Sequence, residues 1–409
     1  MISPNKKALY IFLMALVPIA ACLTQFLYPS KAGDARGPAY AGSVSCMQCH
    51  KDVYSSYLHS AHLQTSRPAN IQTVHGSFAK GQNTFDFGTG QKMVMEKRGS
   101  GLYQTGYVNG KQVQTERFDI TIGGVKAETY LYWKGNKLFE LPMSYFKNLH
   151  GWTNSPGYAK GIINFDRPIV TRCLECHTSY IYEVPQQSAI RQQPEYDKNT
   201  LIYSIDCERC HGPAARHVEF HLDNPAEKKA HFMVSYRSLT RDQKLNTCAV
   251  CHSGNRDKFE ISTFNFKPGD TLDNFKVHDY FPQKQNLADL DVHGNQNSLL
   301  SISKCFLMSN MDCMSCHSAH NTDRGDLVMY SQKCTNCHNA ANHNTCTQKL
   351  AAALKTNCID CHMPEQASGA IAVQTATERN TTPYQVRTHR IAIYPDQSQK
   401  IMNYLKNTK

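Results

Sequence analysis

Beyond residue 30 the sequence has few long hydrophobic runs, and the mean hydropathy of the 409-residue chain is −0.50. A polypeptide of this length ordinarily forms roughly two or three domains, each around a hydrophobic core. The shortage of apolar runs argues against such cores as the main organisers of this chain. Another apolar component is therefore expected to supply part of the interior.

Dense runs of Lys and Arg are also missing, although the formal net charge is +11. Domains that bind nucleic acid carry clustered basic residues, often with aromatic side chains between them. Nucleic acid is therefore excluded as an expected partner. Repeats of fixed period are absent as well, which excludes a solenoid.

The pentapeptide Cys-x-x-Cys-His, by contrast, occurs seven times, and we number the copies 1 to 7 in chain order. It is the attachment sequence for c-type haem, in which two thiols form thioethers with the porphyrin and the histidine ligates the iron. The two-residue gap lets one helical turn present all three groups to one porphyrin. The thiols belong to Cys46, Cys49, Cys173, Cys176, Cys207, Cys210, Cys248, Cys251, Cys313, Cys316, Cys334, Cys337, Cys358 and Cys361. The proximal histidines are His50, His177, His211, His252, His317, His338 and His362.

Zinc sites and redox dithiols use similar spacings but explain the sequence less well. A structural zinc site takes four ligands, usually from two pairs that face each other. Here an odd number of pairs each carries its own histidine. A thioredoxin-like dithiol occurs once, within a βαβ unit. We therefore predict seven covalent haems, and because each ferric haem adds a net charge of about −1, they offset most of the positive charge.

The N-terminal segment is typical of an exported bacterial protein. Lys6 and Lys7 precede an apolar stretch, and Ile19-Ala20-Ala21-Cys22 resembles a lipobox with Cys22 as the lipidated residue. The stretch Ala8–Tyr28 is also long enough to cross a bilayer as an uncleaved anchor helix. A simple cleaved signal is a third reading. All three place the haem motifs outside the cytoplasm, on the periplasmic or outer face of a membrane.

The segment between motifs 1 and 2 has the character of β-structure. Asn109-Gly110, a pair that favours a type I′ turn, separates the alternating runs Leu102–Val108 and Lys111–Ile122. Further strands are expected at Thr129–Trp133 and Lys137–Leu141. The aromatic residues of this segment are expected to form its core.

These observations predict a mainly α fold with extensive loops, organised by packed haems, into which a small antiparallel β module is inserted. The expected divisions are a signal or anchor segment (1–33), a first haem segment (34–70), the β module (71–146) and a six-haem cytochrome domain (147–409).

The sixth ligand of each iron decides between electron transfer and catalysis. A second histidine closes the iron, whereas an open position admits a substrate. Seven of the 19 histidines are proximal, so the supply permits seven bis-histidine haems but does not require them. The remaining histidines are His59, His62, His75, His150, His217, His221, His231, His278, His293, His320, His343 and His389.

Several segments resemble the cytochrome c-554 family, tetrahaem c-type cytochromes that accept electrons in ammonia oxidation, and its larger multihaem relatives. The segment Tyr40-Ala41-Gly42-Ser43, followed by Tyr54, Tyr57, Ser60 and His62, is similar to the family's first-haem segment. Cys207–Val218 (CERCHGPAARHV), Cys313–His320 (CMSCHSAH), Cys358–Pro364 (CIDCHMP) and Arg387–Ile391 (RTHRI) resemble other family motifs. Ala319 stands where the family pattern usually has proline. The resemblance implies distal ligands at His62 (in preference to His59), His217, His293, His320 and His389, with His343 as a further candidate.

The chain departs from related enzymes in two respects. It has no C-x-x-C-K, so it lacks the lysine-ligated catalytic haem of typical pentahaem nitrite reductases, and octahaem hydroxylamine oxidoreductases carry one haem more. The β module is not part of the minimal tetrahaem pattern. Outside the motifs, Cys305 and Cys346 remain in an oxidising compartment, where an exposed free thiol is a liability. A Cys305–Cys346 disulfide is expected, the alternative being two buried thiols.

Electron transfer between redox partner proteins is the leading hypothesis for function, with a membrane quinol-oxidising donor and an acceptor in the periplasm or at the cell surface. The alternative is a multi-electron oxidoreductase that acts on a small nitrogen or sulfur compound at one open haem. The five expected distal histidines are fewer than the seven haems, which is consistent with the open iron that this alternative requires.

Overall fold

The computed structural model describes residues 33–88, 90–158, 161–186, 193–254, 257–278, 286–339, 357–375 and 380–407. The N-terminal segment with Cys22 lies outside these residues, as do His343 and Cys346. The predictions made for the lipobox or anchor, for His343 and for the Cys305–Cys346 disulfide therefore fall outside the described chain. Among the described helices, none has both the length and the apolar character needed to cross a bilayer.

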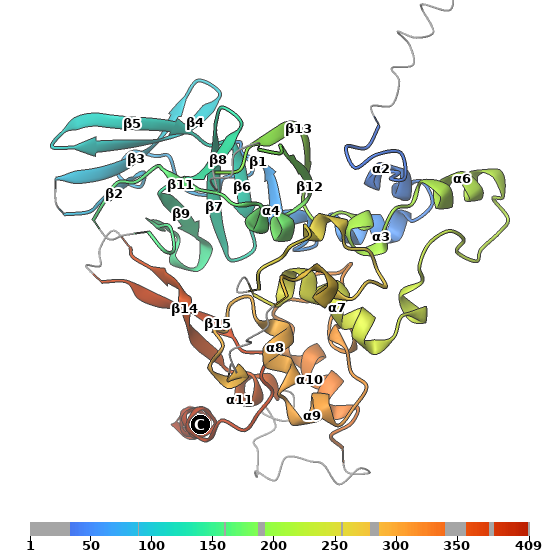
Figure 1. The fold of residues 1–409 in the computed structure, drawn as a ribbon. Coiled ribbons are helices and arrows are strands. Elements are labelled where there is room, and N and C mark those ends of the chain that lie inside the picture. The colour runs from blue at the N-terminus through green and yellow to red at the C-terminus, as the bar shows by residue number, and fades with distance from the viewer. Residues whose placement is uncertain are drawn as a thin grey trace, which may run out of the picture.

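A seven-stranded antiparallel sheet forms one wall of the β-rich part of the molecule (Figure 1). Its path runs β1-β6-β7-β8-β11, with β9 paired to β7 and β10 paired to β9. The strands are β1 (Ser66–Pro68), β6 (Ile120–Gly123), β7 (Ala127–Lys134), β8 (Lys137–Glu140), β9 (Met143–Phe146), β10 (Gly151–Asn154) and β11 (Arg167–Pro168). The sheet thus includes residues on both sides of the segment 71–146.

The second sheet has four strands in chain order: β2 (Thr84–Asp86), β3 (Gln91–Arg98), β4 (Gly101–Val108) and β5 (Lys111–Arg117). The expected hairpin at Asn109-Gly110 is confirmed, because β4 and β5 pair antiparallel and both turn residues have positive φ, 49° and 79°. The second strand ends earlier than predicted. After Arg117 the chain crosses to the other sheet, where β6 begins at Ile120.

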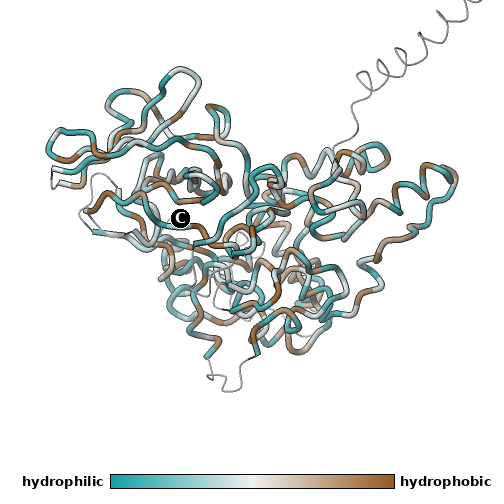
Figure 2. Tube along the Cα trace, turned by 45° about the horizontal axis from the view of Figure 1, so that its top comes forward, coloured by the Kyte–Doolittle hydropathy of each residue, from teal (hydrophilic) through white to brown (hydrophobic). Residues whose placement is uncertain are grey.

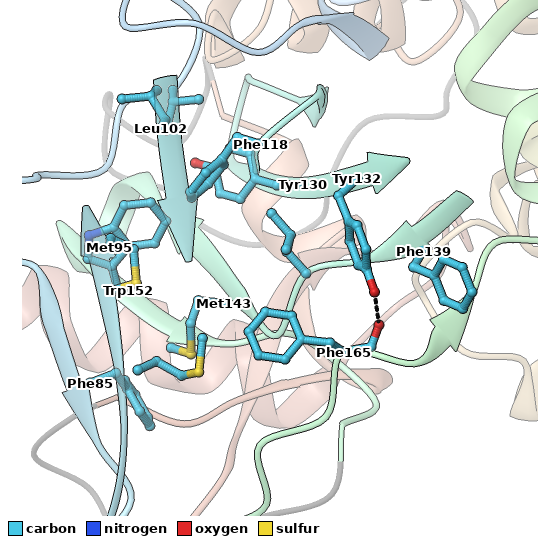
Figure 3. Close-up of a cluster of buried hydrophobic side chains, with 13 residues drawn as sticks. Phe85, Met95, Leu102, Phe118, Tyr130, Tyr132, Phe139, Met143, Trp152 and Phe165 are labelled. Atoms are coloured by element: carbon cyan, nitrogen blue, oxygen red, sulfur yellow. Dashed lines mark hydrogen bonds between the residues drawn. The ribbon is translucent and has the colours of Figure 1, made fainter. Parts of the chain in front are cut away.

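The two sheets enclose a core of aromatic and sulfur-containing side chains (Figure 3). Tyr132 donates its hydroxyl hydrogen to the carbonyl of Phe165 at 2.8 Å, and the Trp152 indole N–H donates to the Ser77 carbonyl at 2.8 Å. Buried phenol and indole groups need such partners, since an unpaired polar group in the interior is costly. Trp152 also packs on Gly76, where a Cβ atom would lie only 2.1 Å from the indole ring.

The rest of the described chain consists of short helices and loops. The helices are α2 (Ser43–Met47), α3 (Lys51–Tyr57), α4 (Thr171–His177), α5 (Cys207–His211), α6 (Ala215–Asp223), α7 (Arg241–His252), α8 (Gln296–Ser301), α9 (Lys304–Leu307), α10 (Leu327–Thr335), α11 (Ile359–His362) and α12 (Pro395–Asn407). Single 3-10 turns are η1 (Leu63–Thr65), η2 (Lys147–Leu149), η3 (Tyr236–Ser238), η4 (Thr263–Asn265), η5 (Leu272–Phe275), η6 (Leu287–Asp289) and η7 (Cys313–Ser315). Hydrophobic and hydrophilic residues alternate over short distances along the coloured part of the trace (Figure 2).

The prediction of a mainly α fold is wrong. The described residues include fifteen strands in four sheets, while their α-helices span only 4 to 13 residues. Each haem motif requires just one helical turn, so seven motifs add little helix. Two hairpins within the predicted cytochrome domain were also missed: β12 (Thr178–Glu183) with β13 (Tyr196–Tyr203), and β14 (Glu365–Val373) with β15 (Thr382–Arg387). Both have register shifts that interrupt the alternation by which a strand is recognised.

The β14–β15 hairpin connects the two parts of the molecule (Figure 1). At its β14 end, Thr153 and Thr375 form an antiparallel bridge, and the Asn154 N–H donates to the Gln374 carbonyl at 3.2 Å. At the other end Arg387 bonds to the Met363 carbonyl and to the Asp360 carboxylate, both at 2.8 Å. The hairpin therefore extends from the edge of the β sheets to motif 7.

Candidate metal centres

The cysteine motifs adopt the single turn that haem attachment requires. In motifs 1, 5, 6 and 7 the histidine N–H donates to the carbonyl of the first cysteine, at 2.9 to 3.1 Å. Motifs 2, 3 and 4 lie within or form helices α4, α5 and α7. One turn brings both thiols and the imidazole to the same side of the backbone, as expected from the spacing.

Three motif histidines face a second imidazole that comes from a different segment. The ring centroids are 6.4 Å apart for His50 and His217, 5.9 Å for His211 and His320, and 6.2 Å for His317 and His389. The rings are near parallel, with interplanar angles of 15°, 10° and 28°. Metal–imidazole bonds are about 2 Å long, so two imidazoles on opposite sides of one ion hold their centroids about 6 Å apart. Rings in direct contact would lie closer, so the spacing fits an ion between them.

Two further motif histidines each have a distal candidate near enough to affect their pKa. Burial, and after it the neighbouring His293, lowers the pKa of His177 to about 4. Burial, followed by His62, lowers the pKa of His252 to about 4 as well. These motif imidazoles are neutral at pH 7, which is the form that binds a metal.

Of the five distal candidates, His217, His320 and His389 each face a motif histidine, at motifs 1, 3 and 5. His62 and His293 lie within electrostatic range of the histidines of motifs 4 and 2. His59 is exposed, and its backbone carbonyl accepts from the Thr322 hydroxyl at 2.6 Å. His75 pairs through Nδ1 with the buried carboxylate of Glu128 in the β sheet. The five distal candidates lie near motifs 1 to 5. Within the described chain, no imidazole stacks on His362 of motif 7.

The outer nitrogens of several histidines have partners that fix ring orientation. Nδ1 lies 3.3 Å from the Ala319 carbonyl in His62, 2.9 Å from the His231 carbonyl in His217, and 3.0 Å from the Ala392 carbonyl in His362. A metal on Nε2 requires the proton on Nδ1, which then donates to these carbonyls. This is the usual second layer of contacts around a metal-bound histidine.

Sequence reasoning missed two carboxylates that lie inside the motifs themselves. Glu208, between the cysteines of motif 3, accepts from the backbone N–H groups of Ala41, Gly42 and Ala214 at 2.8 to 2.9 Å. Glu208 thereby holds the residues before motif 1 against motif 3. Arg36 is also buried there, and it contacts Glu208 at 3.2 Å together with Asp34 and Asp206. The only sequence signal was an acidic residue at a variable position of the motif.

Glu175 occupies the same place in motif 2. Its carboxylate accepts from the Ser262 hydroxyl at 2.7 Å and the Thr263 N–H at 2.9 Å. Arg172 contacts it at 3.3 Å. The side chain is nearly fully buried, so these partners replace the water that an ionised carboxylate would otherwise need.

Direct contacts connect the motifs further. Arg209 of motif 3 donates to the Glu175 carbonyl in motif 2 at 3.3 Å, and Arg172 before motif 2 donates to the Val250 carbonyl in motif 4 at 2.9 Å. Helix α7, which carries motif 4, packs against η7 of motif 5. Cysteines of neighbouring motifs also lie close together in three pairs: Cys46 with Cys207, Cys176 with Cys251, and Cys248 with Cys313.

Helix α10 makes the last two connections. The Tyr330 hydroxyl lies 3.2 Å from Nδ1 of His317 in motif 5, and the Ser331 hydroxyl accepts from the Cys358 N–H of motif 7 at 2.9 Å. The same helix carries Cys334 of motif 6. These contacts link all seven motifs in the order 1-3-2-4-5-6-7.

Comparison with known proteins agrees with this geometry. Residues 158–212, which include motifs 2 and 3, match the model of the family described as cytochrome c554 and c-prime. The fold is similar to the crystal structure of the outer cell wall cytochrome OcwA, with a TM-score of 0.51, 16% identity, and coverage of 89% of this chain and 82% of that chain. No curated protein sequence matches the chain. The fold is thus similar to that of a multihaem cytochrome, and residues 158–212 are similar to the cytochrome c554 and c-prime family.

Proposed function

We propose that the chain transfers electrons through seven covalently attached c-type haems, at least five of them closed by two histidines. The spacing of the stacked imidazole pairs, 5.9 to 6.4 Å, carries this proposal. Haem, when bound, supplies one-electron chemistry at its iron. The histidines supplied by the chain would fill both axial positions, which leaves no place for a substrate at motifs 1 to 5.

The order of contacts between motifs supports a continuous route. Each motif touches the next through a hydrogen bond, a thiol pair or packed helices, so successive cofactors would be held close together. Motif 1 and motif 7 are the ends of this order. We infer that electrons enter at one of these ends and leave at the other, with the protein fixing the distances and the local environment of each site.

The location and partners form a second part of the proposal. The basic and apolar character of residues 1–33 supports export, with a tether through lipidated Cys22 or an anchor helix. The similarity of fold to an outer cell wall cytochrome is in keeping with this. A membrane quinol-oxidising donor and an acceptor outside the cytoplasm are the expected redox partners. Fractionation of cells that express the Cys22→Ser variant distinguishes the tethers, since only a lipid anchor is lost.

Low-temperature EPR of the fully oxidised, haem-loaded protein, with spin quantitation, tests the proposal. We expect seven haems per chain by haem assay, all of them low-spin. His389→Ala should convert one haem to the high-spin state, because it removes one member of a stacked pair. His59→Ala is the matched control, since His59 is exposed and faces no motif histidine, and it should leave the spectrum unchanged.

A high-spin signal that integrates to one haem in the unmodified protein would contradict a role in electron transfer alone. It would favour instead the oxidoreductase that acts on a small nitrogen or sulfur compound. Motif 7 is the place to look for such an open iron, because no imidazole in the described chain stacks on His362. Fewer than seven haems per chain would contradict the stoichiometry.

A further inference from the structure

We propose that Tyr330 sets the reduction potential at motif 5 through the hydrogen bond between its hydroxyl and His317, an inference that rests on the proposed electron-transfer function. The Tyr330 oxygen lies 3.2 Å from Nδ1 of His317. The two rings meet edge to face, with centroids 5.3 Å apart. His317 in turn stacks on His389, so the phenol contacts the outer side of a complete histidine pair.

Ligation decides which atom donates in this hydrogen bond. If Nε2 of His317 binds iron, Nδ1 carries the proton and must donate, and Tyr330 must accept. The phenol oxygen of Tyr330 then accepts through a lone pair at 3.2 Å. At His62, His217 and His362 the corresponding acceptor is a backbone carbonyl, which no substitution can remove.

The position of Tyr330 in its helix places it between two motifs. The Asp326 side chain caps α10 by accepting from the Met329 N–H at 2.8 Å, and the helix contains no Gly or Pro. Tyr330 precedes Cys334 of motif 6 by one turn, and the Cys334 thiol points back to its carbonyl at 3.7 Å. One helical turn therefore carries the attachment point of motif 6 and the residue that contacts the iron ligand of motif 5.

The direction of the effect follows from the chemistry of the imidazole. An acceptor at Nδ1 increases the electron density that Nε2 gives to the iron. Greater donation favours the ferric state, which lowers the reduction potential. Removal of the phenol oxygen should therefore raise the potential of one haem and leave the other six unchanged.

Spectroelectrochemical titration of the full, haem-loaded chain tests this inference with Tyr330→Phe and Tyr330→Leu. Both variants should shift the midpoint potential of one haem to more positive values, with all haems still low-spin by EPR. The affected haem should be the one that becomes high-spin in His389→Ala. Tyr182→Phe is the control, because it removes an exposed phenol on strand β12 that contacts no motif histidine.

Two outcomes would overturn the inference. If Tyr330→Phe leaves every potential as it is in Tyr182→Phe, the hydrogen bond has no effect. If only Tyr330→Leu shifts a potential, the cause is packing of the ring and not the hydroxyl. Either result is distinct from failure of the proposed function, which would already appear as missing low-spin haems in the unmodified protein.

Discussion

The β sheets and the haem-bearing region differ in what fills their interiors. Between the sheets the interior consists of side chains such as Phe85, Met93, Tyr130 and Tyr132, all with no measurable exposure. In the haem-bearing region the helices are short, and apolar side chains such as Leu307 and Met308 are 66% and 79% exposed beside the motifs. We therefore expect the first region to be stable by itself and the second to need a cofactor to supply apolar surface.

Buried carboxylates occur in both regions. In the sheets, Glu128 is fully buried, pairs with Arg67 at 3.0 Å and contacts Nδ1 of His75. Near the motifs, Glu208 and Glu175 accept backbone N–H groups from distant segments. Glu128 likewise accepts from the backbone N–H of His75 at 3.0 Å, so buried carboxylates hold distant segments together in both regions.

Removal of haem is expected to have the largest effect on stability. It tests most directly whether the haem-bearing region alone depends on the cofactor. In a chain produced without haem attachment, amides of α7 and α10 should exchange with solvent at rates close to those of an unfolded chain. Amides of β3, β4 and β7 should remain protected, because their core contains no cofactor. Hydrogen exchange followed by mass spectrometry measures both. Loss of protection in both regions would show that the sheets also depend on haem.

Arg36→Met should destabilise the haem-bearing region by about 3–5 kcal/mol, because it leaves buried carboxylates without their cation. Arg36 contacts Asp34, Asp206 and Glu208 at 2.7 to 3.2 Å. Denaturant unfolding followed at the haem absorption band measures the change. In the control, Arg98→Met, an exposed pair with Glu96 is removed, and the expected cost is below about 1 kcal/mol. Equal costs would contradict the role assigned to the Arg36 cluster.

The stability of the β sheets is expected to vary with pH because of Glu140. Burial raises the pKa of Glu140 to about 7, despite Arg167 at 3.1 Å. The unfolded chain therefore loses this proton at lower pH than the folded chain, and stability falls as pH rises from about 4.5 to 7. At about 1.4 kcal/mol per pKa unit, the total effect is about 3 kcal/mol.

Thermal unfolding followed by far-ultraviolet circular dichroism at pH 5 and pH 8 checks this expectation. Glu140→Gln should reduce the loss of stability between the two values, while the exposed Glu219→Gln should not. The predicted sign is wrong if the wild-type protein is more stable at pH 8 than at pH 5 and Glu140→Gln removes that difference.

The smallest expected effect is that of Trp152→Phe in the β core. The substitution leaves the Ser77 carbonyl without its donor and removes part of the contact with Phe118 and Tyr130. We expect a cost of about 1–3 kcal/mol, with no change in the haem EPR spectrum. Trp133→Phe, at a half-buried position, should cost less. A changed haem spectrum in Trp152→Phe would show that the two regions are coupled.

Local sequence predicted the parts of the molecule that depend on local chemistry. The motif turns require only five consecutive residues, and Asn109-Gly110 specifies its own turn, so both were predictable. The resemblance to a known family directed attention to His62 and His217. Sequence could not show that Glu208 bonds to Ala41 and Gly42, because those partners lie far away in the chain. The strands β12–β15 were missed because register shifts in both hairpins interrupt the alternation by which a strand is recognised.

The paired histidines also have a consequence for the order in which the chain can be assembled. The pairs His50–His217, His62–His252, His177–His293, His211–His320 and His317–His389 overlap along the sequence, so each begins before the preceding one is complete. Iron bound between such partners would act as a series of interlocking cross-links, each closing a long loop. The N-terminal sites would stay half-ligated until the later segments are in place. Once His389 is bound, no single segment could detach without breaking at least one of these cross-links.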